Sequence, residues 1–341
     1  MLALQILGGL IAVIIVYLVV IIFFPVLKVE PQPTKKIDIS NKEIPKNREN
    51  VYFDVHGTKV SGWFYKPEGE KMQYPCIVMS HGFGGTKDMS LEQYALKFAK
   101  AGYATLTYDY RYYGESGGEP RQVYCAVYQI DDLKGAVEYV TSRDDVEKVV
   151  LWGTSAGAAY GINVASFNHD IAAVIAQCGA FDHKEDNKLY MDREGLVFFL
   201  KLFMHGQRDK GRSRFGLSPH VFPAYGKPGT IAMLTAPGAF EGIEELAKES
   251  VTFKNEACGR LALLPHMKNP IELAVSVECP VQVLVCTEDG LVSPKSHTRL
   301  VEALKNTEVI EYPIGHFDIY HGEYFEKATD DMIDFLSKLN L

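Results

Sequence analysis

The sequence lacks any excess of basic residues. Its 35 Lys and Arg are outnumbered by 43 Asp and Glu among 341 residues, so the formal net charge is -8. Proteins that bind nucleic acid through its phosphates carry a basic patch or stripe, and this chain has none. The composition therefore argues against nucleic acid as a partner.

Metal-binding cysteine patterns and glycosylation sequons are also lacking. The six cysteines form no Cys-x-x-Cys pair and show no spacing typical of metal ligands. Cys76, Cys178 and Cys286 fall in or at the ends of apolar runs, which predicts buried free thiols. No Asn-x-Ser/Thr sequon occurs. Both absences fit a reducing compartment.

The first 27 residues lack a charged side chain, and Gln5 is their only strongly polar one. An apolar run of this length can cross a bilayer as one helix. A cleaved signal peptide is the alternative, but it would have a basic start, a shorter apolar core and a small-x-small exit. We therefore expect residues 1–27 to be an uncleaved transmembrane anchor, which makes a membrane one partner of the chain.

Residues 28–49 combine prolines with positive charge. Pro31, Pro33 and Pro45 mark the segment as a tether rather than a packed element. Its basic residues are Lys28, Lys35, Lys36, Lys42, Lys46 and Arg48. By the positive-inside rule, they predict a single-pass membrane protein whose C-terminal domain lies in the cytoplasm.

Residues 50–341 lack internal repeats, and apolar strand patterns alternate with helical ones. Runs at 51–55 and 59–65 around a glycine turn predict an antiparallel hairpin. Strands are then expected at 76–80, 103–108, 148–152, 171–178, 281–286 and 309–312, with helices at 91–101, 123–141, 156–168, 297–305 and 324–339. This alternation predicts a mainly parallel sheet with helices on both faces.

The alternation breaks between about 182 and 270. This segment is strongly charged at first and then rich in Gly and Pro, which predicts a lid inserted late in the sheet. Its apolar run at 197–204 is expected either to meet a lipid-like acyl chain or to pack on the core.

One motif within the alternation favours nucleophilic chemistry. Gly153-Thr154-Ser155-Ala156-Gly157 joins a predicted strand directly to a predicted helix. Glycines are needed on both sides of the turn because a Cβ at either would meet the neighbouring backbone. Ser155 is then held on a strained corner with its hydroxyl exposed, as a serine nucleophile requires. An ordinary glycine-rich turn is the alternative reading of the motif by itself.

Loops after three other strands supply complementary groups. The glycine-rich loop after the first parallel strand can aim the N–H of Phe83 at an oxyanion, with the N–H of Ala156 as its partner. Asp289 can orient an imidazole and is preferred to Glu288 because its shorter side chain holds the ring more tightly. His316, after the last strand, is the candidate general base. Taken singly, these motifs also fit a plain turn, a solvated acidic turn and a surface histidine.

The chain order Ser155, Asp289, His316 resembles that of the α/β-hydrolase superfamily. The loop 109–118, Asp-Tyr-Arg-Tyr-Tyr-Gly-Glu-Ser-Gly-Gly, is similar to the Asp-x-Arg-x-x-Gly-x-Ser loop common there. The tail 315–328 resembles lidded esterases and thioesterases related to dienelactone hydrolases and X-prolyl peptidases. The resemblance runs from about residue 50 to the end. It implies an α/β-hydrolase fold with a mainly parallel eight-stranded sheet and an inserted lid.

The resemblance and the spacing together imply acyl transfer through a Ser-His-Asp triad. The expected substrate is a small-molecule or lipid-like acyl ester or thioester, and the reaction needs no metal or organic cofactor. An acyltransferase, a peptidase for small amides and a non-catalytic binding protein on the same scaffold are the alternatives. Nothing in the sequence indicates an oligomeric state.

Overall fold

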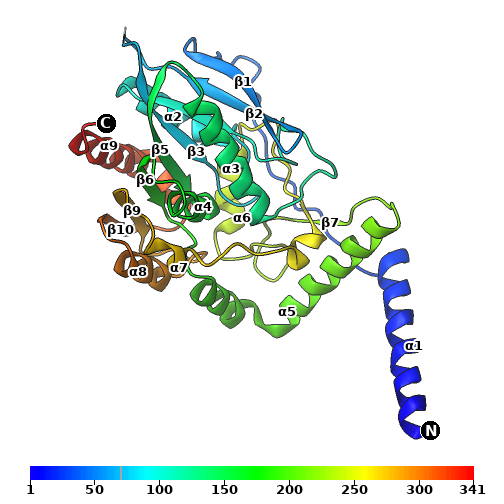
Figure 1. Cartoon of the computed structure of the whole chain (residues 1–341). Coiled ribbons are helices and arrows are strands. Elements are labelled where there is room, and N and C mark those ends of the chain that lie inside the picture. The colour runs from blue at the N-terminus through cyan, green and yellow to red at the C-terminus, as the bar shows by residue number, and fades with distance from the viewer. Residues whose placement is uncertain (70) are drawn as a thin grey trace.

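An eight-stranded sheet forms the centre of the computed structural model, which describes residues 1–69 and 71–341 (Figure 1). The spatial order of the strands is β1-β2-β4-β3-β5-β6-β9-β10. They span Arg48–Val55 (β1), Thr58–Tyr65 (β2), Tyr74–Ser80 (β3), Ala104–Tyr108 (β4), Val146–Thr154 (β5), Ile171–Gln177 (β6), Val281–Cys286 (β9) and Thr307–Tyr312 (β10). β2 pairs antiparallel with β1 and β4, and every other pair is parallel. The predicted mainly parallel sheet is confirmed.

Burial explains the strand sequences. Every residue of β3 and β9 is buried, as expected for central strands covered on both faces, and both are mainly apolar apart from Ser80 and Gln282. The edge strand β1 instead alternates buried and exposed positions after its first residues, because only one of its faces meets the core.

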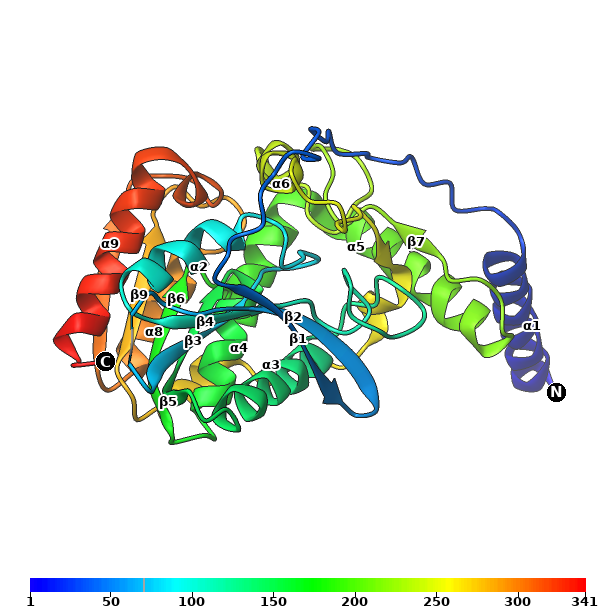
Figure 2. The ribbon, with the colours of Figure 1, turned by 90° about the horizontal axis from the view of Figure 1, so that it is seen from above.

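Helices cover both faces of the sheet (Figures 1 and 2). Helices α2 (Leu91–Lys100) and α9 (Gly322–Lys338) contribute to one apolar core. Helices α3 (Ala126–Thr141), α4 (Ala156–Ala165), α7 (Pro270–Ala274) and α8 (Pro294–Ala303) contribute to the other. In α2, the buried residues Leu91, Tyr94, Ala95, Phe98 and Ala99 recur at helical spacing, so one stripe of the helix faces the sheet.

The segment predicted as a lid, residues 182–270, lies between β6 and β9. It contains α5 (His183–Arg214), β7 (Val221–Phe222), α6 (Ala239–Ala247), β8 (Ala257–Cys258) and the 3₁₀ helix η1 (Gly259–Leu263). Helix α5 consists of two helical segments that meet at Gly195, whose φ of 74° and ψ of 168° are not helical.

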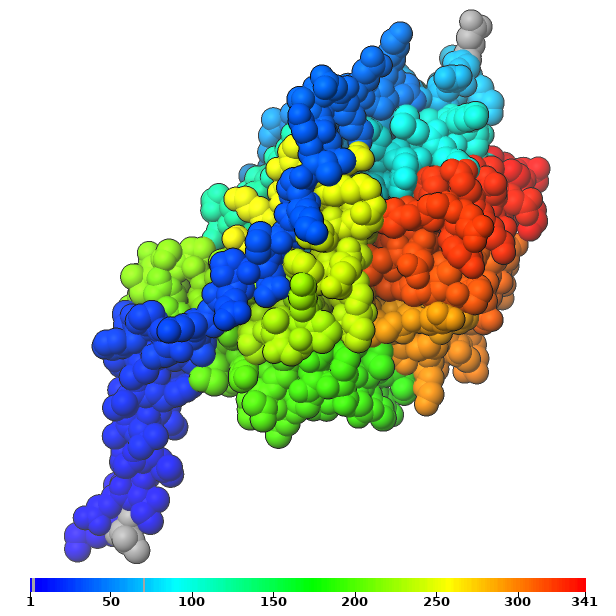
Figure 3. Space-filling view, turned by 180° about the vertical axis from the view of Figure 1, so that it is seen from behind, coloured from blue at the N-terminus to red at the C-terminus, as the bar shows by residue number. Residues whose placement is uncertain are grey.

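Residues 1–47 precede the sheet and consist of a projecting helix and an extended segment that lies on the domain. Helix α1 (Leu2–Phe23) projects away from the domain and is long and apolar enough to cross a membrane. The segment after it contains no helix or strand before β1, as expected of a tether. It differs from the expected unpacked linker because it lies along the lid surface (Figure 3), where Ile37 N–H donates to Lys248 O at 2.9 Å. A second short 3₁₀ helix, η2 (Asp318–Tyr320), precedes α9.

Candidate active site

Ser155 occupies the corner between β5 and α4. Its φ of 55° and ψ of -121° are strained for a residue with a side chain. A Cβ on Gly153 would lie 2.3 Å from Gly157 O, and one on Gly157 would lie 2.3 Å from Ser80 O. The expectation that both glycines are required by close backbone approach is therefore confirmed. Ser155 is half-buried, and its side chain lines a small cavity.

His316 and Asp289 meet at the same edge of the sheet. They lie in the loops that follow β10 and β9, and parallel neighbours bring these loops together. His316 Nδ1 donates to Asp289 Oδ2 at 2.5 Å. The other carboxylate oxygen, Oδ1, accepts the N–H groups of Leu291 at 2.7 Å and Val292 at 2.9 Å. Glu288 is exposed. Of the two neighbouring carboxylates, Asp289 is the one that reaches the imidazole.

His316 and Asp289 shift each other's pKa. Burial by itself would lower the pKa of His316, but the Asp289 carboxylate opposes this, and the pKa rises to about 9. Burial would likewise raise the pKa of Asp289, but the His316 charge and hydrogen bond hold that pKa below its usual value. The Asp289 carboxylate therefore stabilises the charged form of the His316 imidazole.

The glycine-rich loop after β3 lies against the Ser155 side chain. A Cβ built on Gly82 would be 3.1 Å from Ser155 Cβ and 3.6 Å from Ser155 Oγ. Neither the Phe83 N–H nor the Ala156 N–H donates a hydrogen bond to any described residue. Ala156 begins α4, where the first N–H groups have no partner within the helix. Both donors are therefore available to an oxyanion next to Ser155.

A cavity of about 40 Å³ joins these groups. Ser155, His316 and Phe83 line it, and the lid contributes Tyr225, Ile243 and Leu246. The contacts among described residues include no hydrogen bond between the Ser155 hydroxyl and His316, although both side chains line the same space. Such contacts are often long without substrate and tighten when it binds.

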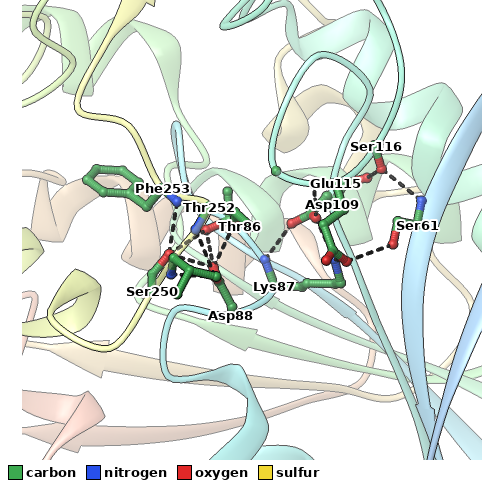
Figure 4. A network of polar contacts seen from close by, with 12 residues as sticks. Ser61, Thr86, Lys87, Asp88, Asp109, Glu115, Ser116, Ser250, Thr252 and Phe253 are labelled. Carbon is green, nitrogen blue, oxygen red and sulfur yellow. Dashed lines mark hydrogen bonds and ion pairs between the residues drawn. The ribbon is translucent and has the colours of Figure 1, made fainter. Parts of the chain in front are cut away.

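Buried polar contacts hold the loop that carries Phe83. Lys87 Nζ contacts Asp109 Oδ2 at 2.7 Å, and Ser116 Oγ donates to Asp109 O at 2.6 Å (Figure 4). On the other side, the Asp88 carboxylate accepts hydrogen bonds from Ser250 Oγ and the Thr252 N–H, both in the lid. Among the described residues, none of the loop 109–118 lines the cavity. The loop 109–118 therefore supports the loop that carries Phe83.

The sequence did not indicate three lid residues that contact the site. Tyr225 OH donates to Phe83 O at 2.7 Å. In α5, Arg193 donates to Gly290 O at 2.7 Å and Asp186 accepts the Ser293 N–H at 2.9 Å, so both hold the turn that carries Asp289. No motif marked them, because the lid contains none and its charged residues are typical of a solvated helix.

His81 lines the same cavity, but the hydrogen-bond contact of its ring is with the backbone. Its Nδ1 contacts Gly82 O at 3.0 Å, and its ring packs edge-on against Tyr110. Burial lowers the pKa of His81 to about 4, so the ring is neutral. Within residues 1–69 and 71–341, no group of three or more His, Cys, Asp or Glu side chains is placed to hold a metal ion.

Comparison with known proteins gives one family and several relatives. Residues 75–323 match the model of the α/β-hydrolase fold family. The quorum-quenching protein AidA of Acinetobacter baumannii is 34% identical over 302 residues, which cover 88% of this chain and 98% of the relative. The polyketide transferase ATR5 of Stachybotrys chlorohalonatus is 27% identical over 305 residues, 86% and 97% of the two chains.

A solved structure agrees with the fold. The α/β hydrolase GrgF from Penicillium sp. sh18 superposes with a TM-score of 0.69 at 23% identity, covering 86% of this chain and 99% of that one. At this identity the similarity concerns the fold.

Proposed function

Because the chain belongs to the α/β-hydrolase fold family, we propose that it is a serine hydrolase that cleaves carboxylic ester or thioester bonds. The proposed catalytic residues are Ser155, His316 and Asp289, with the N–H groups of Phe83 and Ala156 as the oxyanion hole. The observation that carries the proposal is the 2.5 Å His316–Asp289 contact beside a cavity that is also lined by the strained Ser155.

The reaction proceeds in two steps. His316 takes the Ser155 Oγ proton as that oxygen attacks the acyl carbonyl carbon, and the Phe83 and Ala156 N–H groups stabilise the oxyanion. His316 then gives the proton to the leaving oxygen or sulfur, and the acyl group stays on Ser155. A water molecule, deprotonated by His316, attacks the acyl-enzyme, and His316 returns that proton to Ser155 Oγ as the acid is released. Asp289 stabilises the imidazolium that forms in both steps.

The small size of the cavity supports a lid that moves to admit a substrate. Its 40 Å³ has room for only about three water molecules. A lipid-like acyl chain enters only if lid residues such as Tyr225, Ile243 and Leu246 move.

Replacing Ser155 tests the proposal. Ser155→Ala abolishes hydrolysis of p-nitrophenyl esters and labelling by a fluorophosphonate while the protein stays folded, because only the Oγ is lost. Ser142→Ala is the matched control, since Ser142 is exposed and its hydroxyl only donates to Tyr139 O. Labelling that survives in Ser155→Ala would contradict the assignment.

Acyl transfer is the second candidate function, supported by the relative named a polyketide transferase. It uses the same residues but delivers the acyl group to an acceptor other than water. Following a labelled acyl group with alcohol and amine acceptors present distinguishes the two, because a transferase forms the new ester or amide faster than the acid. A small-amide peptidase would instead cleave amides as fast as esters, and a binding protein would cleave neither.

The proposal divides the chain into an anchor at 1–27, a tether at 28–49 and a hydrolase domain at 50–341. The anchor is supported by the apolar side chains of Leu4–Phe23, most of which are not buried against the domain. The basic residues of the tether support a cytoplasmic domain.

A further inference from the structure

The outer face of α5 exposes large apolar side chains. Leu196, Val197, Leu200 and Phe203 are 63%, 65%, 53% and 46% exposed. Leu196, Leu200 and Phe203 recur at the i, i+4, i+7 spacing of one helical face. Phe198 and Leu202, between them, are buried in the core and hold α5 on the domain. The run 197–204 is therefore both packed on the core and open to the outside.

The same face continues into the contact between α5 and α1. Tyr17 OH donates to Gln207 Oε1 at 2.6 Å, and the rings of Phe23 and Phe215 lie 5.1 Å apart. Gly211 leaves room for Ile22, because a Cβ there would lie 2.5 Å from Ile22 Cγ1. The exposed patch is thus continuous with the docking site of the apolar N-terminal helix.

Arginines of α5 fix the end of α1. Arg208 is buried and donates to Ile21 O at 2.5 Å and to Phe24 O at 2.6 Å. Arg212 donates to Ile22 O at 3.3 Å. These bonds satisfy carbonyls that the last turn of a helix leaves without partners. They hold the exit point of α1 at the C-terminal part of α5, and α1 projects from the side of the domain that α5 forms (Figure 3).

The charge of this region is opposite to that of the chain. Residues 196–217 contain five Lys and Arg and one acid, whereas the whole chain carries -8. The acid, Asp209, is buried and paired with Arg260, while Lys201, Lys210 and Arg214 are exposed. Exposed apolar side chains flanked by cations are typical of a surface that rests on anionic lipid.

An apolar groove lies where the two helices meet. Its volume is about 500 Å³, and its walls include Leu18 and Val19 of α1 and Phe215 of the lid. Lys210 and Arg214 also line it. A groove of this composition suits lipid tails beneath anionic headgroups.

We propose that the bilayer entered by α1 also covers the outer face of α5, so that the lid rests in its interfacial layer. Leu196, Val197, Leu200 and Phe203 enter the boundary between headgroups and acyl chains, and Lys201, Lys210 and Arg214 meet anionic headgroups. This inference rests on the proposed anchor. It places the lid residues that hold the Asp289 turn next to the membrane.

The test uses the full chain in vesicles of phosphatidylcholine and phosphatidylglycerol. Val197→Cys, in a Cys279→Ser background, is labelled with the environment-sensitive fluorophore NBD. Val275→Cys is the matched control, because Val275 is 55% exposed on another part of the surface. The five remaining cysteines are buried and so are shielded from the label. Ester hydrolysis by each labelled variant reports that it is folded.

The proposal predicts blue-shifted emission at position 197 that lipids with a shallow nitroxide quench, and water-like, unquenched emission at 275. Equal emission at the two positions overturns it. Blue-shifted emission that the nitroxide lipids leave unquenched also overturns it, because a second protein copy then covers the face. Resistance of the chain to carbonate extraction reports α1 separately. A retained chain with water-like emission at 197 refutes only the α5 contact, and an extracted chain refutes the anchor as well.

Discussion

Gly153 and Gly157 allow the close backbone approach around Ser155. Gly161, on the same helix as Gly157, provides a matched control for a substitution there. In Gly157→Ala the new Cβ would meet Ser80 O at 2.3 Å, so α4 and the end of β3 must separate. Overpacking of this kind costs about 1–3 kcal/mol of unfolding free energy. Because the nucleophile and the oxyanion loop move with it, turnover falls by roughly 10²-fold. Urea unfolding and p-nitrophenyl acetate turnover measure both effects.

Gly161→Ala is the control. Its Cβ would meet Val174 Cγ1 at 3.5 Å, an ordinary contact, and alanine is favoured over glycine within a helix by about 0.5–1 kcal/mol. This variant keeps its stability and turnover. If Gly157→Ala behaves the same way, the close approach of α4 to β3 is not a requirement of the fold.

Replacing Asp289 or Glu288 by its amide is expected to affect turnover very differently, although the two carboxylates are adjacent. Asp289→Asn keeps the shape of the side chain but favours the wrong histidine tautomer. Turnover then falls by up to about 10⁴-fold, the effect of the equivalent change in chymotrypsin-like proteases. Glu288→Gln costs less than about tenfold because Glu288 is exposed and lies at the surface. Both variants are assayed on one ester at one pH, and a dead Glu288→Gln with an active Asp289→Asn would reverse the assignment.

Tyr225 is the lid residue whose hydroxyl bonds the Phe83 carbonyl, and we propose that it positions the loop that carries Phe83. Tyr225→Phe removes the 2.7 Å hydrogen bond to Phe83 O and leaves that carbonyl without this partner, at a cost of about 1–3 kcal/mol. Because the Phe83 N–H acts on the oxyanion in the proposed mechanism, we expect kcat to fall about tenfold with KM nearly unchanged.

Tyr113→Phe is the matched control for Tyr225. The Tyr113 hydroxyl is buried and has no hydrogen-bond partner among the described residues, so its removal leaves kcat and stability intact. A rise in KM without a fall in kcat in Tyr225→Phe would show that Tyr225 contacts substrate instead of positioning the loop.

The strands and helices of the domain could be predicted because their sequences follow local rules. The mainly apolar run 281–286 matches β9 in its bounds, because both faces of a central strand are covered, and its one polar residue, Gln282, is hydrogen-bonded. Helix ends were less exact. The helix expected at 123–141 begins at Ala126, because residues 123–125 carry apolar side chains that fit either a helix or a buried loop.

The contacts between distant segments could not be predicted. Nothing in the sequence around Tyr225 indicates that its hydroxyl reaches Phe83, because that contact depends on how the lid folds over the sheet. The tether was expected to be unpacked from its prolines and charges. Its backbone nevertheless bonds to the lid, since extended chain offers N–H and C=O groups that proline content does not remove from the other residues.

At the scale of the whole molecule, a series of hydrogen bonds connects the tether to the candidate active site. Asn255 Nδ2 donates to Gln32 O of the tether at 2.7 Å and to Tyr225 O at 2.8 Å. Tyr225 in turn holds Phe83. Hydrogen bonds therefore link the tether to the lid, and the lid to the loop that carries Phe83. Among the described residues, the side-chain hydrogen bonds of α1 go to Gln207, Arg208 and Arg212 of α5.

Two truncations separate the anchor from the tether. Removing residues 1–27 leaves the Gln32 and Ile37 contacts in place, and the Arg208 side chain that bonded α1 becomes accessible to water. We expect a folded enzyme with full turnover, kept soluble with mild detergent because the outer face of α5 stays apolar. Removing residues 1–47 also deletes five hydrogen bonds to the lid, of which those of Lys35 and Lys42 are exposed to water and add little. The other three are made by Gln32, Lys36 and Ile37. At about 1 kcal/mol for each bond and about 2–4 °C for each kcal/mol, Tm falls by roughly 6–12 °C, and turnover falls with it because the lid loosens around Tyr225. Thermal unfolding and ester turnover of the two truncated proteins in the same detergent measure these effects.

Equal Tm values for the two truncated proteins would show that the tether contacts add nothing to the stability of the fold. An inactive protein after removal of residues 1–27 would show that α1 belongs to the catalytic domain.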